Sequence, residues 1–238
     1  MTIRIDRIFP LLLACTNVPA DGPYNRVKES RDDTGDTATE DTADGPCPAG
    51  MALVAEVCVD RWEAVLEGDP GEANQGFDWP DGSTTAVATS VGGQLPTVNV
   101  SWYQAWAACE NAGKHLCTVA EWQAACSPDG RTYPWGEDGR PEDRCGLVDP
   151  DNETPAAEGL TPGGSHPDCA SLEGVHDLIG NAWEWVDPGV ESDGRPLTAK
   201  VGGAYYSGYG HSRCATEPFE GHPPDFDGTI AARCCLTP

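Results

Sequence analysis

The chain has 238 residues and a formal net charge of −25. This length suits one large domain with appendages. The charge argues against nucleic acid and against an electrostatic grip on anionic lipid, because both need a cationic surface. The 11 cysteines are an odd number and lack the spacing of a structural zinc site. They indicate an oxidising compartment, with ten cysteines in five disulfides and one that has a separate role.

The first 14 residues read as a short signal peptide, because two arginines precede an apolar run far too short to span a bilayer. The tetrapeptide Leu-Leu-Ala-Cys that ends at Cys15 resembles the lipobox of bacterial lipoproteins. Cys15 is then the lipidation site, which explains the eleventh cysteine, and the lipid is the only expected contact with a membrane. A plain secretory signal and a merely apolar cytosolic N-terminus are the alternatives.

Residues 15–46 continue from the lipidated cysteine as an acidic segment rich in Thr, Gly and Ala, with no apolar periodicity. Such a segment buries too little surface to offset its chain entropy, so we predict a disordered linker stretched by like charges. The spacing of an EF-hand loop is missing. The folded domain is expected over 47–238.

Two helices are predicted near the middle of the domain. Ser101 with Gln104 and Thr118 with Glu121 have the spacing of capping boxes. The first helix places two tryptophans and a cysteine on one face and ends at a glycine, and the second ends at an Asp-Gly turn; these residues are Trp102, Trp106, Cys109, Gly113, Asp129 and Gly130.

Three segments are β-rich: 51–63, 199–209 and 229–236. Long loops are expected over 66–95, 137–170 and 186–198. Loops of this length in a compact domain are stapled or functional. The fold class is therefore α+β, loop-rich and disulfide-stapled.

Four motifs then occur in order: "PTVNVSWYQAWAACENAGKHLCTVAEWQAAC", "YPWG", "GVHDLIGNAWEWV" and "VGGAYYSG…SRCA…AARCC". Together they resemble the formylglycine-generating enzyme family, or sulfatase-modifying factor domain, over roughly 47–238. The resemblance implies an elaborated C-type-lectin-like fold with little regular secondary structure.

In that family the GNxWEW turn holds structural calcium. By position, the resemblance implies ligation here by Asp177, by the carbonyls of Gly180 and Ala182, and by Glu184, and a hard cation favours such oxygen donors. The two tryptophans of the motif would be buried beside the ion, with Asn181 holding the turn. A polar turn whose carboxylates face solvent is the alternative, and no second calcium site is assigned.

The resemblance also implies two disulfides, Cys109–Cys234 and Cys126–Cys214. Three further pairs are inferred by elimination: Cys47–Cys58, Cys145–Cys169 and Cys117–Cys235.

Active members of the family bind copper through two thiolates, which suit copper(I). The chain has no cysteine between Cys169 and Cys214. The two thiolate positions carry Ser207 and Tyr209 instead, so neither copper nor formylglycine formation is expected. The five histidines are isolated in sequence, so they predict no metal site of their own.

Around the degenerate positions, the expected cleft contains Tyr205, Tyr206, Ser207, Tyr209 and His211. Aromatic rings with hydroxyls suit a peptide or a sugar, and the alternative is that these side chains only pack the strand.

Two functional hypotheses follow from these residues. The preferred one is a catalytically inert lipoprotein of the bacterial cell envelope, sorted to the outer membrane, that binds a protein, peptide or glycan or scaffolds an assembly. The other is a sulfatase-modifying oxidoreductase with an unrecognised set of ligands, which would convert a substrate cysteine to formylglycine.

Overall fold

A computed structural model describes residues 45–69, 84–147, 159–189, 197–208, 211–215, 218–220 and 228–238. All of them belong to one unit of the chain, residues 39–238. Within this unit short strands and helices are joined by long irregular segments, so the fold is α+β, as the sequence predicts. The predicted signal peptide, Cys15 and nearly all of the predicted linker lie outside the described residues.

The first sheet has the strand order β1-β2-β10-β5, and all of its pairings are antiparallel. Its strands are β1 (Met51–Val54), β2 (Val57–Asp60), β10 (Cys234–Leu236) and β5 (His115–Leu116). β1 and β2 form a hairpin. The C-terminal strand is therefore an interior strand of this sheet.

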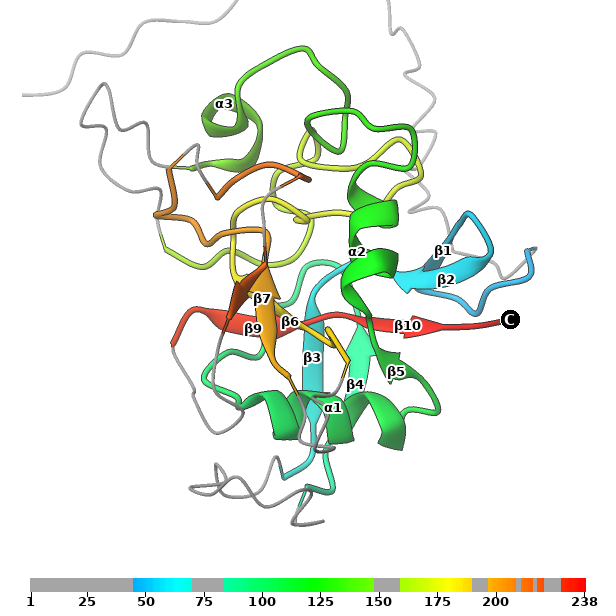
Figure 1. The fold of residues 1–238 in the computed structure, drawn as a ribbon. Coiled ribbons are helices and arrows are strands. Elements are labelled where there is room, and N and C mark those ends of the chain that lie inside the picture. Colours follow the sequence, from blue (N-terminus) through cyan, green and yellow to red (C-terminus); the bar gives the residue numbers. More distant parts are fainter. Residues whose placement is uncertain are drawn as a thin grey trace, which may run out of the picture. The chain divides into compact units, whose positions relative to one another are not determined.

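The second sheet has the order β8-β7-β6-β9. It comprises β6 (Trp183–Val186), β7 (Ala199–Val201), β8 (Phe219–Glu220) and β9 (Ile230–Ala232), and β9 runs parallel to β6. One residue, Arg233, separates β9 from β10. The chain thus passes from one sheet into the other at Arg233, along the red segment of Figure 1.

A separate hairpin consists of β3 (Ala64–Glu67) and β4 (Val87–Ser90). β4 lies inside the stretch 66–95 that the sequence predicts as a loop, so that prediction is wrong at this strand. The strand segment predicted over 199–209 is also too long, because β7 ends at Val201 and a turn comes after it.

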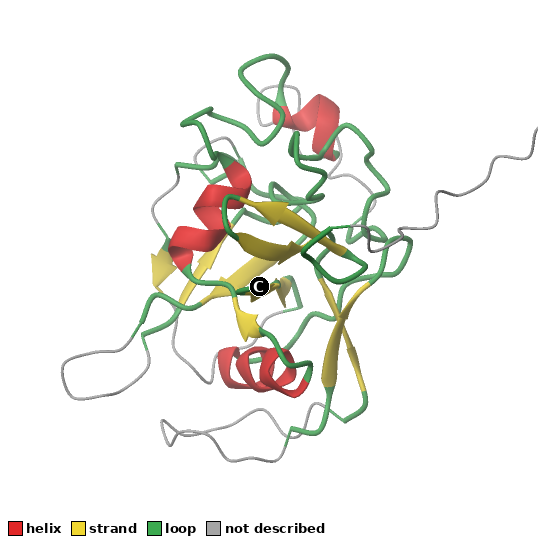
Figure 2. Cartoon of the chain, turned by 90° about the vertical axis from the view of Figure 1, so that its right-hand side faces the viewer, coloured by secondary structure: helices red, strands yellow, loops and turns green. Residues whose placement is uncertain are grey.

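Among the described residues, three helices lie around the strands in Figure 2: α1 (Trp102–Asn111), α2 (Val119–Cys126) and α3 (Pro141–Cys145). Both predicted capping boxes are present, at Ser101 and Thr118. α1 packs against β4, β5 and β6, and α2 packs against β2. The sequence patterns do not predict α3, a single short helix that begins with a proline, which suits the first helical turn.

The core contains several tryptophans that are both buried and hydrogen-bonded. Trp102 donates from Nε1 to the carbonyl of Val186 at 2.9 Å, and Trp185 donates to the carbonyl of Val100, also at 2.9 Å. These bonds tie β6 to α1 and to Val100, which precedes that helix. They satisfy the indole N–H groups, which would otherwise destabilise the core.

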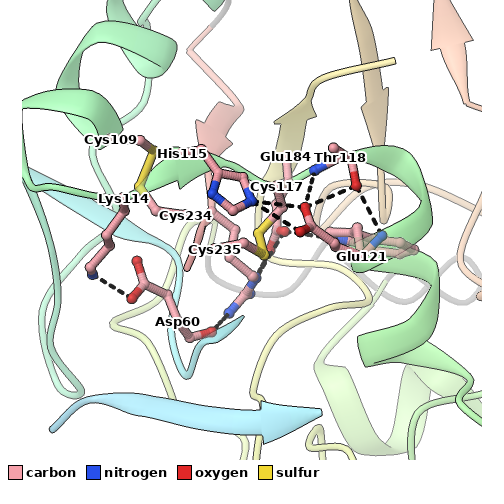
Figure 3. Close-up of a disulfide and its surroundings, with 12 residues drawn as sticks. Asp60, Cys109, Lys114, His115, Cys117, Thr118, Glu121, Glu184, Cys234 and Cys235 are labelled. Atoms are coloured by element: carbon pink, nitrogen blue, oxygen red, sulfur yellow. Dashed lines mark hydrogen bonds and ion pairs between the residues drawn. A yellow bond between two sulfur atoms is a disulfide. The ribbon is translucent and has the colours of Figure 1, made fainter. Parts of the chain in front are cut away.

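Five disulfides staple the domain, and they are the five pairs expected from the sequence. They are Cys47–Cys58, Cys109–Cys234, Cys117–Cys235, Cys126–Cys214 and Cys145–Cys169. Figure 3 shows that neighbouring residues of β10, Cys234 and Cys235, reach separate partners. β10 is thereby tied both to α1 and to the residue that follows β5. No described helix is long and apolar enough to cross a membrane.

Candidate functional site

The GNAWEW segment forms a tight turn that leads into β6. Asp177, Gly180 and Asn181 all have positive φ angles, of 59°, 81° and 52°. Glycine, asparagine and aspartate tolerate this left-handed region best. A Cβ at Gly180 would also lie 2.6 Å from Leu147 Cδ2, so that this leucine side chain would have to shift. The residue types at these three positions of the motif are therefore explained by backbone geometry before any ligand is considered.

Asn181 holds the turn, as predicted, and does so through a buried partner. Its Nδ2 donates to Glu63 Oε2 at 2.5 Å, and its Oδ1 accepts from the backbone amide of Thr161 at 2.9 Å. The amide of Ala182 donates to Glu63 Oε1 at 2.9 Å. Glu63 is 2% exposed, and this acid is therefore a structural part of the turn although it lies on a distant segment of the chain.

Glu184 pairs with Arg233, and both residues are fully buried. Arg233 donates from Nη2 to Glu184 Oε1 at 2.5 Å and from Nε to both carboxylate oxygens at 3.1 and 3.0 Å. Trp122 donates from Nε1 to Glu184 Oε2 at 2.7 Å. The two oxygens of Glu184 therefore already have three donors from two residues.

The remaining donors of Arg233 bond to backbone carbonyls. Nη1 donates to the carbonyl of Asp60 at 2.7 Å, and Nη2 donates to that of His176 at 2.8 Å. Asp60 itself accepts from Lys114 Nζ at 2.5 Å (Figure 3). The guanidinium thus connects β2, the turn at 176–177 and β6, so we name Arg233, Glu184, Glu63 and Asp177 the polar centre.

Negative charge exceeds positive charge in the polar centre, because three carboxylates face one guanidinium. Burial, followed by the charges of Asp177 and Glu184, raises the pKa of Glu63 well above its usual value. Burial raises the pKa of Asp177 to about 6. For Arg233, burial is the largest single influence and lowers the pKa, but the charge and hydrogen bonds of Glu184 together with the charges of Glu63 and Asp177 outweigh it, so the net pKa is raised. Arg233 therefore keeps its positive charge, whereas the pKa values of the acids shift with their surroundings.

The four expected calcium ligands, Asp177, Gly180, Ala182 and Glu184, lie in and next to one turn. Oxygen donors and excess negative charge fit a hard cation. A calcium ion here would share Glu184 with Arg233 and Trp122, and would share Asp177 with the amide of Gly164, which donates to Oδ2 at 2.7 Å. Among the described residues no three His, Cys, Asp or Glu side chains converge as a metal site. Calcium stays a prediction.

Ser207, at the first of the two expected thiolate positions, is buried in a turn. Its Oγ accepts from the amide of Ala204 at 2.9 Å, and its own amide donates to the carbonyl of Ala204 at 2.8 Å. Ser212 Oγ donates to the carbonyl of Ser207 at 3.4 Å. This hydroxyl therefore closes the turn. Tyr209, at the second position, lies outside the described residues.

The other expected cleft residues surround this turn without forming one surface. Tyr205 and Tyr206 pack edge to face, with ring centroids 5.1 Å apart. Tyr206 is 47% exposed, and its hydroxyl lies 3.1 Å from that of Thr229. His211 packs at a tilt against Trp183, with centroids 5.7 Å apart. Among the described members of the expected cleft, only Tyr206 presents a ring largely to solvent.

A cavity of about 410 Å³ lies elsewhere, at the C-terminal end of α2. Its walls include Gln123, Ser127, Arg131 and Cys214, and none of the expected cleft residues. The lining of this cavity therefore does not include the exposed Tyr206.

Sequence reasoning missed Glu63 and Arg233. Arg233 does carry a local signal, because it is a lone charge in the apolar segment 229–236, and such a residue needs a buried acid. Glu63 has no comparable signal, because its partner Asn181 lies 118 residues further along the chain.

The family model described as "Sulfatase-modifying factor enzyme 1-like domain" matches residues 49–234. The chain is 30% identical over 142 residues to the "Inactive C-alpha-formylglycine-generating enzyme 2" of Mus musculus, covering 56% of this chain and 46% of that protein. It is 33% identical over 123 residues to the "Formylglycine-generating enzyme" of Bos taurus, with coverages of 47% and 32%.

A third relative is the "Hercynine oxygenase" of Mycolicibacterium smegmatis, 32% identical over 114 residues, with coverages of 45% and 25%. The chain spans less than half the length of these three curated relatives. Their names cover inactive and active proteins, so the likeness alone does not decide activity.

Two solved structures share the fold. "Treponema denticola variable protein 1" has a TM-score of 0.53 at 13% identity and covers 81% of this chain and 92% of its own. "CarF" has a TM-score of 0.53 at 16% identity, with coverages of 76% and 86%. These likenesses concern the fold alone.

Proposed function

The chain belongs to the sulfatase-modifying factor enzyme 1-like domain family, and from that premise we propose that it is a member without copper chemistry. Its role is to bind a protein, peptide or glycan, or to scaffold an assembly, at the bacterial cell envelope. The relative named as inactive supports this proposal, as does the chemistry at Ser207.

Ser207 is the observation that carries the proposal. Copper(I) favours thiolates, whereas a neutral hydroxyl is a hard and weak ligand. The hydroxyl of Ser207 is moreover buried and bonded to the amide of Ala204. Binding a metal through Ser207 Oγ would require breaking the turn that this oxygen closes.

The described cysteines offer no substitute for the missing pair. All ten of them, from Cys47 to Cys235, are in disulfides. A disulfide sulfur carries no negative charge and cannot act as a thiolate ligand. Copper chemistry at this place would first require a disulfide to be reduced.

Copper(I) titration tests the proposal directly. The purified full chain is titrated with copper(I) and then given oxygen and a peptide with a sulfatase motif, while oxygen uptake and aldehyde product are measured. We expect neither stoichiometric copper binding nor aldehyde, while an active formylglycine-generating enzyme run in parallel gives both. Stoichiometric copper with aldehyde product would establish the oxidoreductase alternative instead.

Tyr206 is the residue with which to test ligand binding, because its ring is exposed beside the turn that Ser207 closes. The full chain is used to capture partners from solubilised envelope proteins and glycans. Tyr206→Ala should lose the captured partner, whereas Leu172→Ala, at a leucine 72% exposed, should retain it. Equal capture by both variants would place the binding face elsewhere.

The lipid anchor at Cys15 is part of the same proposal. Cells fed radiolabelled palmitate should label the wild-type chain and not Cys15→Ser, and the label should fractionate with the outer membrane. Label that persists in Cys15→Ser would overturn the anchor.

Calcium at the GNAWEW turn is proposed as a structural ligand. The excess carboxylates of the polar centre support it, because a divalent cation would neutralise them. The midpoint of thermal unfolding should be several degrees higher in calcium than in a chelator, since a ligand that binds only the folded state stabilises it. Asp177→Asn should reduce this difference, and identical midpoints would count against calcium.

A further inference from the structure

β1 is an edge strand of the first sheet. The order β1-β2-β10-β5 gives it β2 on one side and no strand of the described chain on the other (Figure 1). An edge strand presents backbone N–H and C=O groups to which another chain can add as a further strand. Edges are commonly protected by lysine, proline or a bulge. β1 has the sequence MALV and an unbroken register with β2, so it carries none of these.

The backbone groups of Leu53 point out of the sheet. Hydrogen-bonded and non-hydrogen-bonded pairs alternate along two antiparallel strands. The amide of Arg61 donates to the carbonyl of Gly50 at 2.9 Å, so these two residues are a hydrogen-bonded pair. Leu53 and Cys58, three positions further along, are therefore a non-hydrogen-bonded pair. The N–H and C=O of Leu53 both face away from β2 and have no hydrogen-bond partner among the described residues.

Met51 limits how far a partner strand can extend along this edge. Its backbone groups also face outward, but its amide donates to the carbonyl of Pro48 at 3.2 Å. Only the carbonyl of Met51 is left to accept from a partner. An antiparallel strand could therefore exchange two hydrogen bonds with Leu53 and donate one more to Met51.

The side chain of Leu53 indicates which residue type would lie beside it. It is 44% exposed, and it shares a face of the sheet with Met51 and with Cys58, which are both buried. Met51 and Cys58 form a small apolar cluster with Cys47 and Leu236. An apolar side chain on an added strand would lie opposite Leu53 and extend this cluster across the edge.

Glu56 indicates the charge of the partner. It is exposed in the turn between β1 and β2 and forms no ion pair within the described part of the chain. On an antiparallel strand, the residue two positions before the one opposite Leu53 would lie opposite Ala55, and a long basic side chain there reaches Glu56. The net charge of −25 attracts such a strand and repels a second copy of this chain.

We propose that the β1 edge binds an extended basic segment of a partner protein by antiparallel strand addition, with an apolar residue opposite Leu53. This site is separate from the binding face tested at Tyr206, because Tyr206 contacts Thr229 next to β9, in the second sheet. Either site can fail without the other.

Peptide titration of the isotope-labelled full chain tests the proposal. The probe is acetyl-Lys-Thr-Val-Thr-Val-amide, whose central valine should lie opposite Leu53. The Leu53 amide resonance should shift and its hydrogen exchange should slow, saturably, at peptide concentrations up to about 5 mM. The matched control has the central valine N-methylated. It lacks the donor to the Leu53 carbonyl and should bind at least about tenfold more weakly.

Three variants separate the edge from the rest of the surface. Leu53→Pro removes the outward N–H and should abolish saturable binding, and proline is tolerated at such an edge position. Unchanged resonances in the second sheet would show that it folds. Leu53→Thr keeps the N–H and should bind within about threefold of the wild type. Glu56→Gln should weaken binding of the lysine peptide by about twofold and leave a peptide with glutamine in its place unaffected.

Four outcomes would overturn the proposal. Equal binding of the N-methylated peptide would mean that the backbone of Leu53 is not paired. Binding retained by folded Leu53→Pro would place the peptide elsewhere. Equal affinity of the wild type for the lysine and glutamine peptides would mean that no basic residue is recognised. Protection of the Leu53 amide that rises with protein concentration, without a response to peptide, would assign the edge to a second copy of the chain.

Discussion

The polar centre and the segment around Ser207 are held in place in different ways. Arg233 binds side chains and carbonyls from β2, from the turn at His176 and from β6. Ser207 is held mainly by its own neighbours, through two bonds with Ala204 and one with Ser212. Long-range bonds specify the framework, and short-range bonds specify the segment where chemistry would occur.

The difference indicates how such a domain can lose a reaction and keep its fold. The longer-range ties of the second segment include backbone bonds from Tyr205 to Asn181 and from Cys214 to Thr132, the Cys126–Cys214 disulfide, and the contacts of Tyr206 with Thr229 and of His211 with Trp183. None of these involves the side chain of Ser207. A change at Ser207 is therefore absorbed locally, whereas a change at Arg233 is felt in both sheets.

Replacing Arg233 is expected to have the largest effect. Arg233→Met leaves Glu184 as a buried charge without its guanidinium, which should cost about 3–5 kcal/mol of the free energy of unfolding. Urea unfolding measures it. The double variant Arg233→Met with Glu184→Leu should be more stable than Arg233→Met alone, because it removes the unpaired charge. A loss below about 1 kcal/mol in the single variant would contradict the central role of the pair.

The two disulfides of β10 are expected to replace each other in part. Cys109–Cys234 and Cys117–Cys235 close nearly the same long loop, with sequence separations of 125 and 118. With either one in place, the other closes only about ten residues, so each single removal should cost less than opening the long loop. Removing both should exceed the sum of the two single losses by about 2 kcal/mol. Purely additive losses in urea unfolding would exclude this redundancy.

Ser207→Ala should have a smaller effect, confined to its own turn. It leaves the amide of Ala204 without its acceptor, which should cost about 1 kcal/mol. Chemical denaturation gives the loss, and amide hydrogen exchange shows where it acts. Protection should fall at 204–208 and stay unchanged in β6 and β9. Loss of protection across the second sheet would show that the segment is not locally held.

His115, which pairs with Glu121, should give the smallest effect. Its hydrogen bond with Glu121 raises the pKa of His115 above its usual value. A raised folded-state pKa means that this stability is present below about pH 6.5 and is lost as the pH rises through the folded-state pKa. The loss should stay below about 1 kcal/mol because the pair is partly exposed.

His115→Gln should remove this pH dependence when urea unfolding is compared between about pH 5.5 and about pH 8.5, on either side of the usual histidine pKa. A matched substitution away from the pair, Glu56→Gln, should leave the dependence unchanged. Unaltered dependence in His115→Gln would assign it to another group.

Sequence patterns predict those features that depend on nearby residues. The capping boxes at Ser101 and Thr118 span only three residues each, so their spacing predicts them. β4 and α3 escape prediction because they are short elements within Gly- and Pro-rich stretches that read as loop. The strand at Trp183–Val186 escapes it as well, because its residues form the second half of a motif whose resemblance points to a turn.

The polar centre could not be predicted in full, because its bonds join residues far apart in the chain. Glu184 reads as a calcium ligand from its motif, and only the fold brings Arg233 to it across 49 residues. The same limit applies to Ser207, where the sequence predicts a missing thiolate but not the turn that its hydroxyl closes.

The position of β10 has a consequence for biosynthesis. Cys109 and Cys117 are made long before Cys234 and Cys235, and meanwhile Cys126, Cys145 and Cys169 emerge as competing thiols. Cys47–Cys58 can close at once, with a separation of only 11. The native cross-links of α1 and of the residue after β5 must await the synthesis of β10, with sequence separations of 125 and 118. Maturation should therefore pass through early mispaired species that a disulfide isomerase resolves.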